Sequence, residues 1–169
     1  MRAPKSPWPS EMSCVRSVFS LLLTTAFLLT GHGLHMTFLP LMASEIGLSQ
    51  AVIGLSGSAY FVGFISGALV TPHIIAKVGH IRSFTTLMAV FLCCFQVLPM
   101  TDAGWVWILT RFLLGAVMCG AYTVVESWLS DQADERSHGR VLGIYTFIVL
   151  TAMAAGQGIL GLTYGNAAQ

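Results

Sequence analysis

Charged side chains are scarce in this sequence. They account for 9% of its 169 residues, whereas 55% of the residues are hydrophobic. An ordinary soluble domain has about 25% charged residues, so this chain has too few to cover a water-soluble fold. We therefore expect an integral membrane protein. A net charge of +1 and the lack of any cluster of Lys or Arg give no reason to expect nucleic acid as a partner.

Cysteine spacing of the kind that holds metal ions is also missing. No C-x-x-C pair is formed by the four cysteines, most of which lie inside apolar runs: Cys14, Cys93, Cys94 and Cys119. We interpret them as small hydrophobic residues that are buried. We expect no metal, no cofactor and no enzymatic activity.

Long apolar runs, in contrast, are plentiful. Five of them approach or exceed the length that crosses about 30 Å of hydrocarbon at 1.5 Å per residue. No A-x-A-like cleavage site follows the first run, so we expect it to remain as an uncleaved helix. The expected fold class is an all-α integral membrane protein, with a tail at 1–16 and a transmembrane domain at 17–169. Its five expected helices are 18–40, 52–71, 84–100, 105–127 and 141–162.

Lysine and arginine are distributed unevenly between the two sides of the expected helices. If the N-terminus is cytoplasmic, the outer segments hold no cation and the inner segments hold seven: Arg2, Lys5, Arg16, Lys77, Arg82, Arg136 and Arg140. The positive-inside rule then predicts a cytoplasmic N-terminus and five crossings, with the end of the chain outside. Trp105 and Trp107 at one end of the fourth helix and Trp128 at the other fit interfacial aromatic belts.

Arg111 lies inside the fourth apolar run. A guanidinium at that depth costs roughly 2.5–3.5 kcal/mol on insertion scales, so other helices or a water-filled cavity must satisfy it. At 100° per residue, four further residues lie within about 60° of Arg111 on the helix surface. They are Gly115, Met118, Tyr122 and Glu126. We interpret this face as part of a pathway wall, with Tyr122 and Glu126 as candidate pathway residues.

The first helix is expected to be interrupted by Gly31-His32-Gly33, and His35 follows one turn after His32 on the same face. His32 and Arg111 have similar expected depths, so we predict that Arg111 faces His32 across a cavity, where the imidazole would serve as a substrate or proton site. The alternative is that His32 bonds a neighbouring helix and His35 reaches the interface. Glu126 is expected to pair with a cytoplasmic cation, or else to be a solvated carboxylate at the helix end.

The second helix carries small residues at helical spacing. Gly63-x-x-x-Gly67 is typical of close helix contact. The segment Gly54-Leu55-Ser56-Gly57 also resembles the nucleophile motif of intramembrane serine proteases of the rhomboid type. Such a hydrolase needs a base within reach of Ser56, yet no later helix is expected to contain histidine, so the protease is a remote alternative.

These features resemble the N-terminal half of a major facilitator superfamily transporter. The fourth helix matches the family's R-x-x-x-G pattern at Arg111 and Gly115, and part of its loop motif is kept at Lys77, Gly79 and Arg82. The segment from Glu126, ESWLSDQADERSHGRVLGIY, is similar to the YcaD-like branch of the family.

The resemblance implies secondary active transport of a small solute, possibly coupled to protons, in the cell (inner) membrane. It also implies a chain truncated after the fifth helix of a six-helix half. The expected partners are the lipid bilayer, an unidentified small-molecule substrate and the missing C-terminal half. The alternative from another class is a membrane scaffold or assembly subunit that does not transport.

Overall fold

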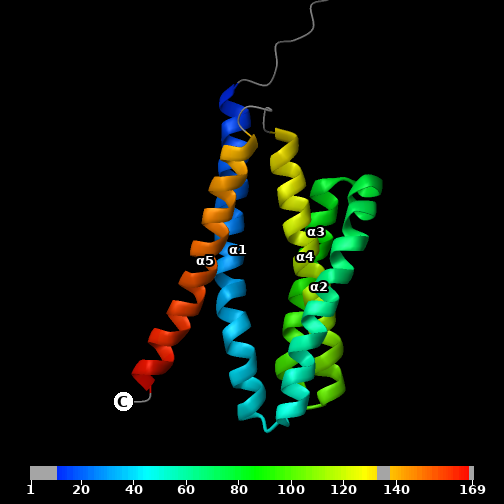
Figure 1. Ribbon diagram of the computed structural model, residues 1–169, viewed down its shortest axis with the longest axis vertical. Coiled ribbons are helices and arrows are strands. Elements are labelled where there is room, and N and C mark those ends of the chain that lie inside the picture. Colours follow the sequence, from blue (N-terminus) through cyan, green and yellow to red (C-terminus); the bar gives the residue numbers. More distant parts are fainter. Residues whose placement is uncertain (1–10, 133–137, 168–169) are drawn as a thin grey trace, which may run out of the picture. The chain divides into compact units, whose positions relative to one another are not determined.

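The computed structural model describes residues 11–132 and 138–167, and within these ranges it contains helices and short connections but no strand. Five helices are long and apolar enough to cross a membrane. The predicted all-α membrane fold with five spans is therefore confirmed. In chain order, the elements are α1 (Glu11–Glu45), α2 (Gln50–Val78), α3 (His80–Val97), the 3-10 turn η1 (Leu98–Met100), α4 (Gly104–Gln132) and α5 (His138–Ala167) (Figure 1).

The end of α1 corrects the sequence analysis, which placed it at Pro40. The helix contains Pro40 and continues to Glu45. Its stop signal is Gly47, which has a φ of 81° and an N–H that donates to the Ser44 carbonyl at 3.1 Å. The next N–H, on Leu48, donates to the Ala43 carbonyl at 3.0 Å, which completes a Schellman motif. A proline removes one backbone donor, a loss that membrane helices tolerate, whereas the reversed glycine ends the helix.

The second helix also runs past its expected end near residue 71. It contains Pro72 and ends at Val78, where Gly79 adopts a φ of 81° and donates its N–H to the Ile75 carbonyl at 2.8 Å. Hydropathy marks the apolar layer, but the helix continues into polar residues until a glycine reverses the chain.

The chain divides into two compact units. The first consists of residues up to Leu34 with those from Leu129 onward, and the second of His35–Trp128. In the first unit, α1 and α5 come into close contact through glycines. A Cβ atom added to Gly33 would overlap the backbone of Met153, and one added to Gly156 would overlap the Thr30 carbonyl oxygen. The helix α1 is continuous through Gly31-His32-Gly33, so this segment is not the break that the sequence suggested. Gly33 instead allows α5 to approach α1 closely.

The second unit contains α2, α3, α4 and the last part of α1 (Figure 1). Glycines on both sides bring α2 and α4 together: a Cβ atom would overlap a backbone carbonyl oxygen of the opposite helix at Gly63, Gly67 and Gly115. Around this contact lies the hydrophobic core, whose buried members are Leu39, Ala43, Tyr60, Cys94, Leu98, Trp107 and Leu114.

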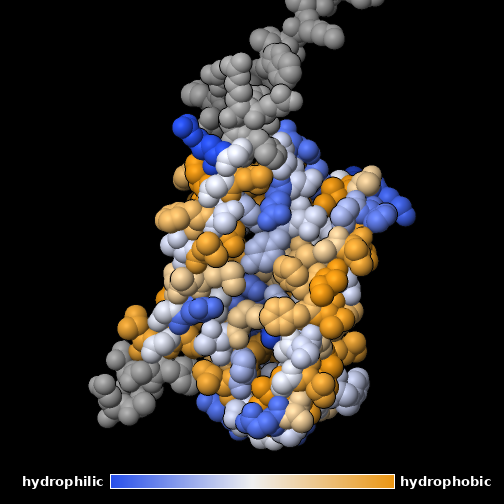
Figure 2. Space-filling view, viewed as in Figure 1, coloured by the Kyte–Doolittle hydropathy of each residue, from blue (hydrophilic) through white to orange (hydrophobic). Residues whose placement is uncertain are grey.

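Large apolar side chains also lie on the outside of the helices, as Figure 2 shows for one face. Examples are Phe27, Phe61, Ile65, Leu92 and Phe147, all of which are exposed. Hydrocarbon surrounds the spans of a membrane protein, so this arrangement suits a bilayer and would be costly in water.

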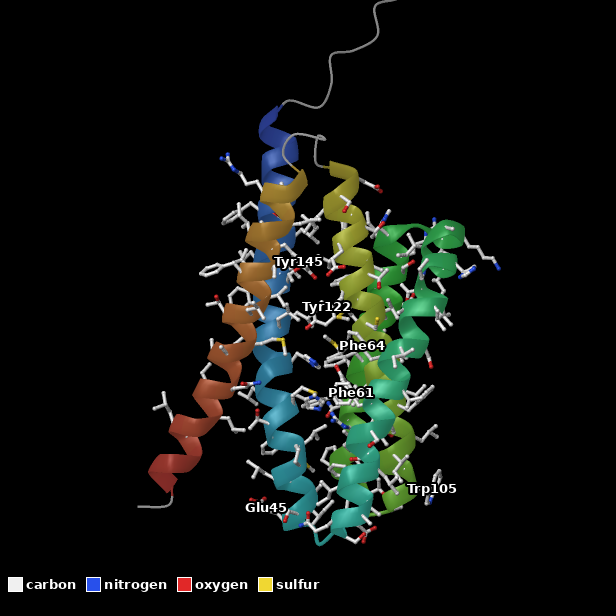
Figure 3. The ribbon with its side chains drawn as sticks, viewed as in Figure 1. Glu45, Phe61, Phe64, Trp105, Tyr122 and Tyr145 are labelled. Atoms are coloured by element: carbon white, nitrogen blue, oxygen red, sulfur yellow. The ribbon has the colours of Figure 1, made fainter. Side chains whose placement is uncertain are left out.

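Two sequence interpretations need correction at this level. Trp107 does not face outward as a residue of an aromatic belt would: it is 1% exposed, and its Nε1–H donates to the Thr101 carbonyl at 2.9 Å. Trp105 is 71% exposed and lies on the outside of α4 (Figure 3). Among the cysteines, Cys94 and Cys119 are buried as expected, but Cys93 is exposed because it lies on the outer side of α3.

Candidate functional site: a buried arginine in the fourth helix

Arg111 is a buried cation in the second unit. It lies on α4, one of the helices suited to crossing a membrane, and it is only 5% exposed. The Nη1–H donates to the Met36 sulfur of α1 at 3.6 Å. On the α2 side, the guanidinium carbon lies 4.8 Å from the centre of the Tyr60 ring. Arg111 therefore contacts one residue of α1 and one of α2.

Neither contact neutralises the charge of Arg111. A thioether sulfur is a weak acceptor, and a cation over an aromatic ring gains about 2 kcal/mol when both are desolvated. Among the residues that the structure describes, no Asp or Glu lies within salt-bridge distance of this guanidinium. The site therefore presents a positive charge that an anionic group could neutralise.

Aromatic rings continue from Tyr60 along the contact between α2 and α4. The ring centres of Tyr60 and Phe64 are 6.3 Å apart, and those of Phe64 and Tyr122 are 6.2 Å apart. Figure 3 labels Phe64 and Tyr122, which lie next to each other. Tyr122 is half-buried and thus links α4 to this row. The sequence analysis singled out Tyr122 but missed Tyr60, Phe64 and Met36.

A signal for Tyr60 exists in the sequence. The buried residues of α2 follow one helical stripe, and Tyr60 is the only large side chain among the small ones: Ser56, Tyr60, Gly63, Gly67 and Thr71. The facing helix supplies Gly115 opposite the Tyr60 backbone, so α2 and α4 approach closely at this residue.

The histidines of α1 lie in different units. His35 is 3% exposed, and its ring packs on the Phe95 ring with 4.6 Å between the ring centres. The alternative in which His35 reaches the interface is therefore wrong. His32 is equally buried, but it belongs to the first unit and Arg111 to the second. Their pairing stays a prediction.

The other end of the second unit holds the remaining site residues. Lys77 and Arg82 are exposed on either side of Gly79. His80 begins α3, and its Nε2 lies 3.0 Å from the Ser127 hydroxyl of α4. Glu126 is exposed, and its expected pairing with a cytoplasmic cation stays a prediction, since Arg136 lies outside the described residues.

Ser56 shows none of the surroundings of a nucleophile. It is buried, and its hydroxyl donates to the Ile53 carbonyl of its own helix at 2.8 Å. A hydroxyl that bonds a carbonyl one turn earlier serves the helix rather than a catalytic base. The protease alternative therefore finds no support in the described residues.

The sequence matches the Major Facilitator Superfamily over residues 21–167. The chain therefore belongs to that family, a family of transporters rather than enzymes, and is a multi-pass membrane protein. This result confirms the resemblance seen in the sequence.

Curated relatives support the same branch. The chain is 29% identical over 147 residues to the "Uncharacterized MFS-type transporter YcaD" of Escherichia coli K12, an alignment that covers 86% of this chain and 38% of the relative. The protein of the same name from E. coli O139:H28 is 29% identical over 121 residues, covering 72% of this chain and 32% of the relative. The chain thus spans well under half the length of these relatives. No solved structure shows a significant match.

Proposed function

We propose that the chain forms the N-terminal part of a secondary transporter that moves a small solute across the membrane, coupled to protons. The observation that carries this proposal is Arg111, a cation buried on a membrane-spanning helix with no acidic partner among the described residues. Burying a charge in a membrane span is costly, and such residues mark ion and substrate pathways. A scaffold would gain nothing from this cost.

In this proposal, Arg111 attracts an anionic group of the solute or sets the protonation state of a carboxylate supplied by the rest of the transporter. Transporters of this superfamily bind their substrates near the midplane, between two halves that rock against each other. His32, Tyr122 and Glu126 would line the same pathway. The glycine contacts of α2 with α4, at Gly63, Gly67 and Gly115, would keep this half rigid during the movement.

The proposed orientation places the N-terminus in the cytoplasm and the end of α5 outside. It rests on the seven cations of the inner segments and the absence of cations from the outer ones. In a cysteine-free background, a maleimide that cannot cross membranes should label Asp102→Cys from outside, and His80→Cys from inside alone. The opposite pattern at either position would reverse the topology.

The transport proposal is tested in two stages. The reading frame beyond codon 169 is sequenced first, and it should encode seven further membrane-spanning segments. The encoded protein is then reconstituted into vesicles that contain the pH dye pyranine, and a panel of organic anions, organic cations and sugars is added outside. At least one solute should change the internal pH.

Arg111→Ala should abolish this solute-dependent signal while the protein still inserts into the membrane, because insertion becomes easier without the cation. Arg140→Ala, which removes an exposed cation from α5, serves as the matched control and should retain the signal. An Arg111→Ala protein with unchanged uptake would refute the role of this residue.

A further inference from the structure

A shallow groove lies on the outer side of α2, near the end of that helix. Its volume is about 380 Å³, and it is lined by Leu69, Val70, His73, Ile74 and Lys77. These residues follow one another along a single face of the helix, at spacings of three and four residues. The groove is therefore a stripe about 12 Å long that runs towards the α2–α3 turn.

The polarity of this groove changes along its length. Leu69 and Val70 are apolar and 69% and 55% exposed, within the span that is suited to hydrocarbon. Lys77 follows in the last turn of α2, where the apolar span ends. A phospholipid has the same order of groups, with acyl chains, glycerol esters and a phosphate in sequence.

The polar end of the groove carries positive charge that the protein does not neutralise. Lys77 is followed by Arg82 in the first turn of α3, and no residue between Glu45 and Asp102 is acidic. Neither cation has a salt bridge among the residues that the structure describes. Figure 2 shows hydrophilic residues over this turn beside hydrophobic ones. The charge is thus complementary to an anion at the membrane surface.

His73 occupies the middle of the groove. Its Nδ1 lies 3.1 Å from the Leu69 carbonyl oxygen, and a carbonyl can only accept, so Nδ1 carries the hydrogen. This bond fixes the ring along the helix about 6 Å deeper than Lys77. That depth corresponds to the glycerol region when a phosphate contacts the lysine.

We propose that this groove binds one anionic phospholipid. The Lys77 ammonium contacts the phosphate, His73 lies beside the glycerol region, and an acyl chain follows Leu69 and Val70. The site is separate from the Arg111 site and does not depend on the transport proposal.

The test uses the 169-residue chain, purified in detergent and mixed with phosphatidylglycerol or with phosphatidylcholine of the same acyl chains. Native mass spectrometry measures the bound lipid. The wild-type chain should bind phosphatidylglycerol more tightly than phosphatidylcholine. Lys77→Gln should weaken phosphatidylglycerol binding about fivefold, the factor expected for one basic side chain near an anionic membrane surface. Arg140→Gln, with the same loss of charge on α5, should bind as wild type.

Two further measurements distinguish binding of the lipid in the groove from simple attraction of any anion to Lys77. Val70→Trp fills the apolar part while keeping Lys77, and it should also weaken phosphatidylglycerol binding. Excess inorganic phosphate should not displace the lipid. Circular dichroism should show unchanged helix content in all three variants, since each position is exposed. Equal losses for Lys77→Gln and Arg140→Gln, full binding by Val70→Trp, or displacement by phosphate would each overturn the proposal.

Discussion

The third and fourth helices have almost the same hydropathy but opposite surroundings. Within the most apolar stretch of each span, 61% of α4 is buried, but only 17% of α3. Between membrane helices there is no hydrophobic driving force, because lipid is as apolar as leucine, so close packing decides which helix is inside. The α4 interior contains Gly115 and Gly120, whereas α3 contains no glycine. Small residues and one cation therefore distinguish the inner helix from the outer one.

The largest effect is expected when an arginine is placed on the outer helix α3 and, in a second variant, the native arginine is removed from the inner helix α4. Leu92 is 63% exposed near the middle of α3, and Leu92→Arg would place a guanidinium against lipid. We expect α3 insertion to become less favourable by about 2.5–3.5 kcal/mol, and Arg111→Leu to make α4 insertion more favourable by a similar amount. A glycosylation assay of translocon-mediated insertion measures both. If Leu92→Arg left α3 insertion unchanged, a guanidinium would cost nothing against lipid, and the burial of Arg111 between helices would not be explained by that cost.

A smaller effect is expected at the contact between α2 and α4. In Gly63→Ala the added methyl group would overlap the Phe112 carbonyl oxygen, so the helices must separate. We expect a loss of about 1–3 kcal/mol in the free energy of unfolding, as for other overpacked contacts. Unfolding by SDS in mixed micelles, followed by circular dichroism, measures this loss.

The matched control for that substitution lies on the same helix. A Cβ atom added to Gly57 has no neighbour within 4 Å, so Gly57→Ala should leave the stability unchanged or raise it slightly through the better helix propensity of alanine. Equal destabilisation by both substitutions would point to α2 backbone flexibility and not to contact with α4.

The sequence predicts the class of fold because hydropathy is summed over whole helices. Five apolar runs identify five spans, and a lone arginine within one of them identifies the span that is most buried among the described helices. Both inferences depend on the cost of transfer into hydrocarbon and need no knowledge of which helices touch.

Helix ends and contact partners depend on finer features. Gly47 ends α1 by adopting a positive φ, although Pro40 is the more conspicuous signal in the sequence. Tyr60 reaches Arg111 because α2 is rotated to face α4, where glycine contacts rather than hydropathy hold the two helices together, and Met36 of α1 also contacts Arg111. Periodicity places residues on a face of one helix but does not say which helix lies opposite.

The two tryptophans near the start of α4 provide the smallest and most specific test. Trp107 is 1% exposed and donates its indole N–H to the Thr101 carbonyl, whereas Trp105, two residues earlier, is 71% exposed. Trp107→Phe removes the hydrogen bond and leaves a small cavity, so we expect a loss of about 1 kcal/mol in the free energy of unfolding. Trp105→Phe removes a ring that faces outward and should leave the SDS unfolding midpoint unchanged. Equal shifts for the two variants would mean that both rings occupy similar surroundings, and that burial at this end of α4 is no greater than on the outer helices.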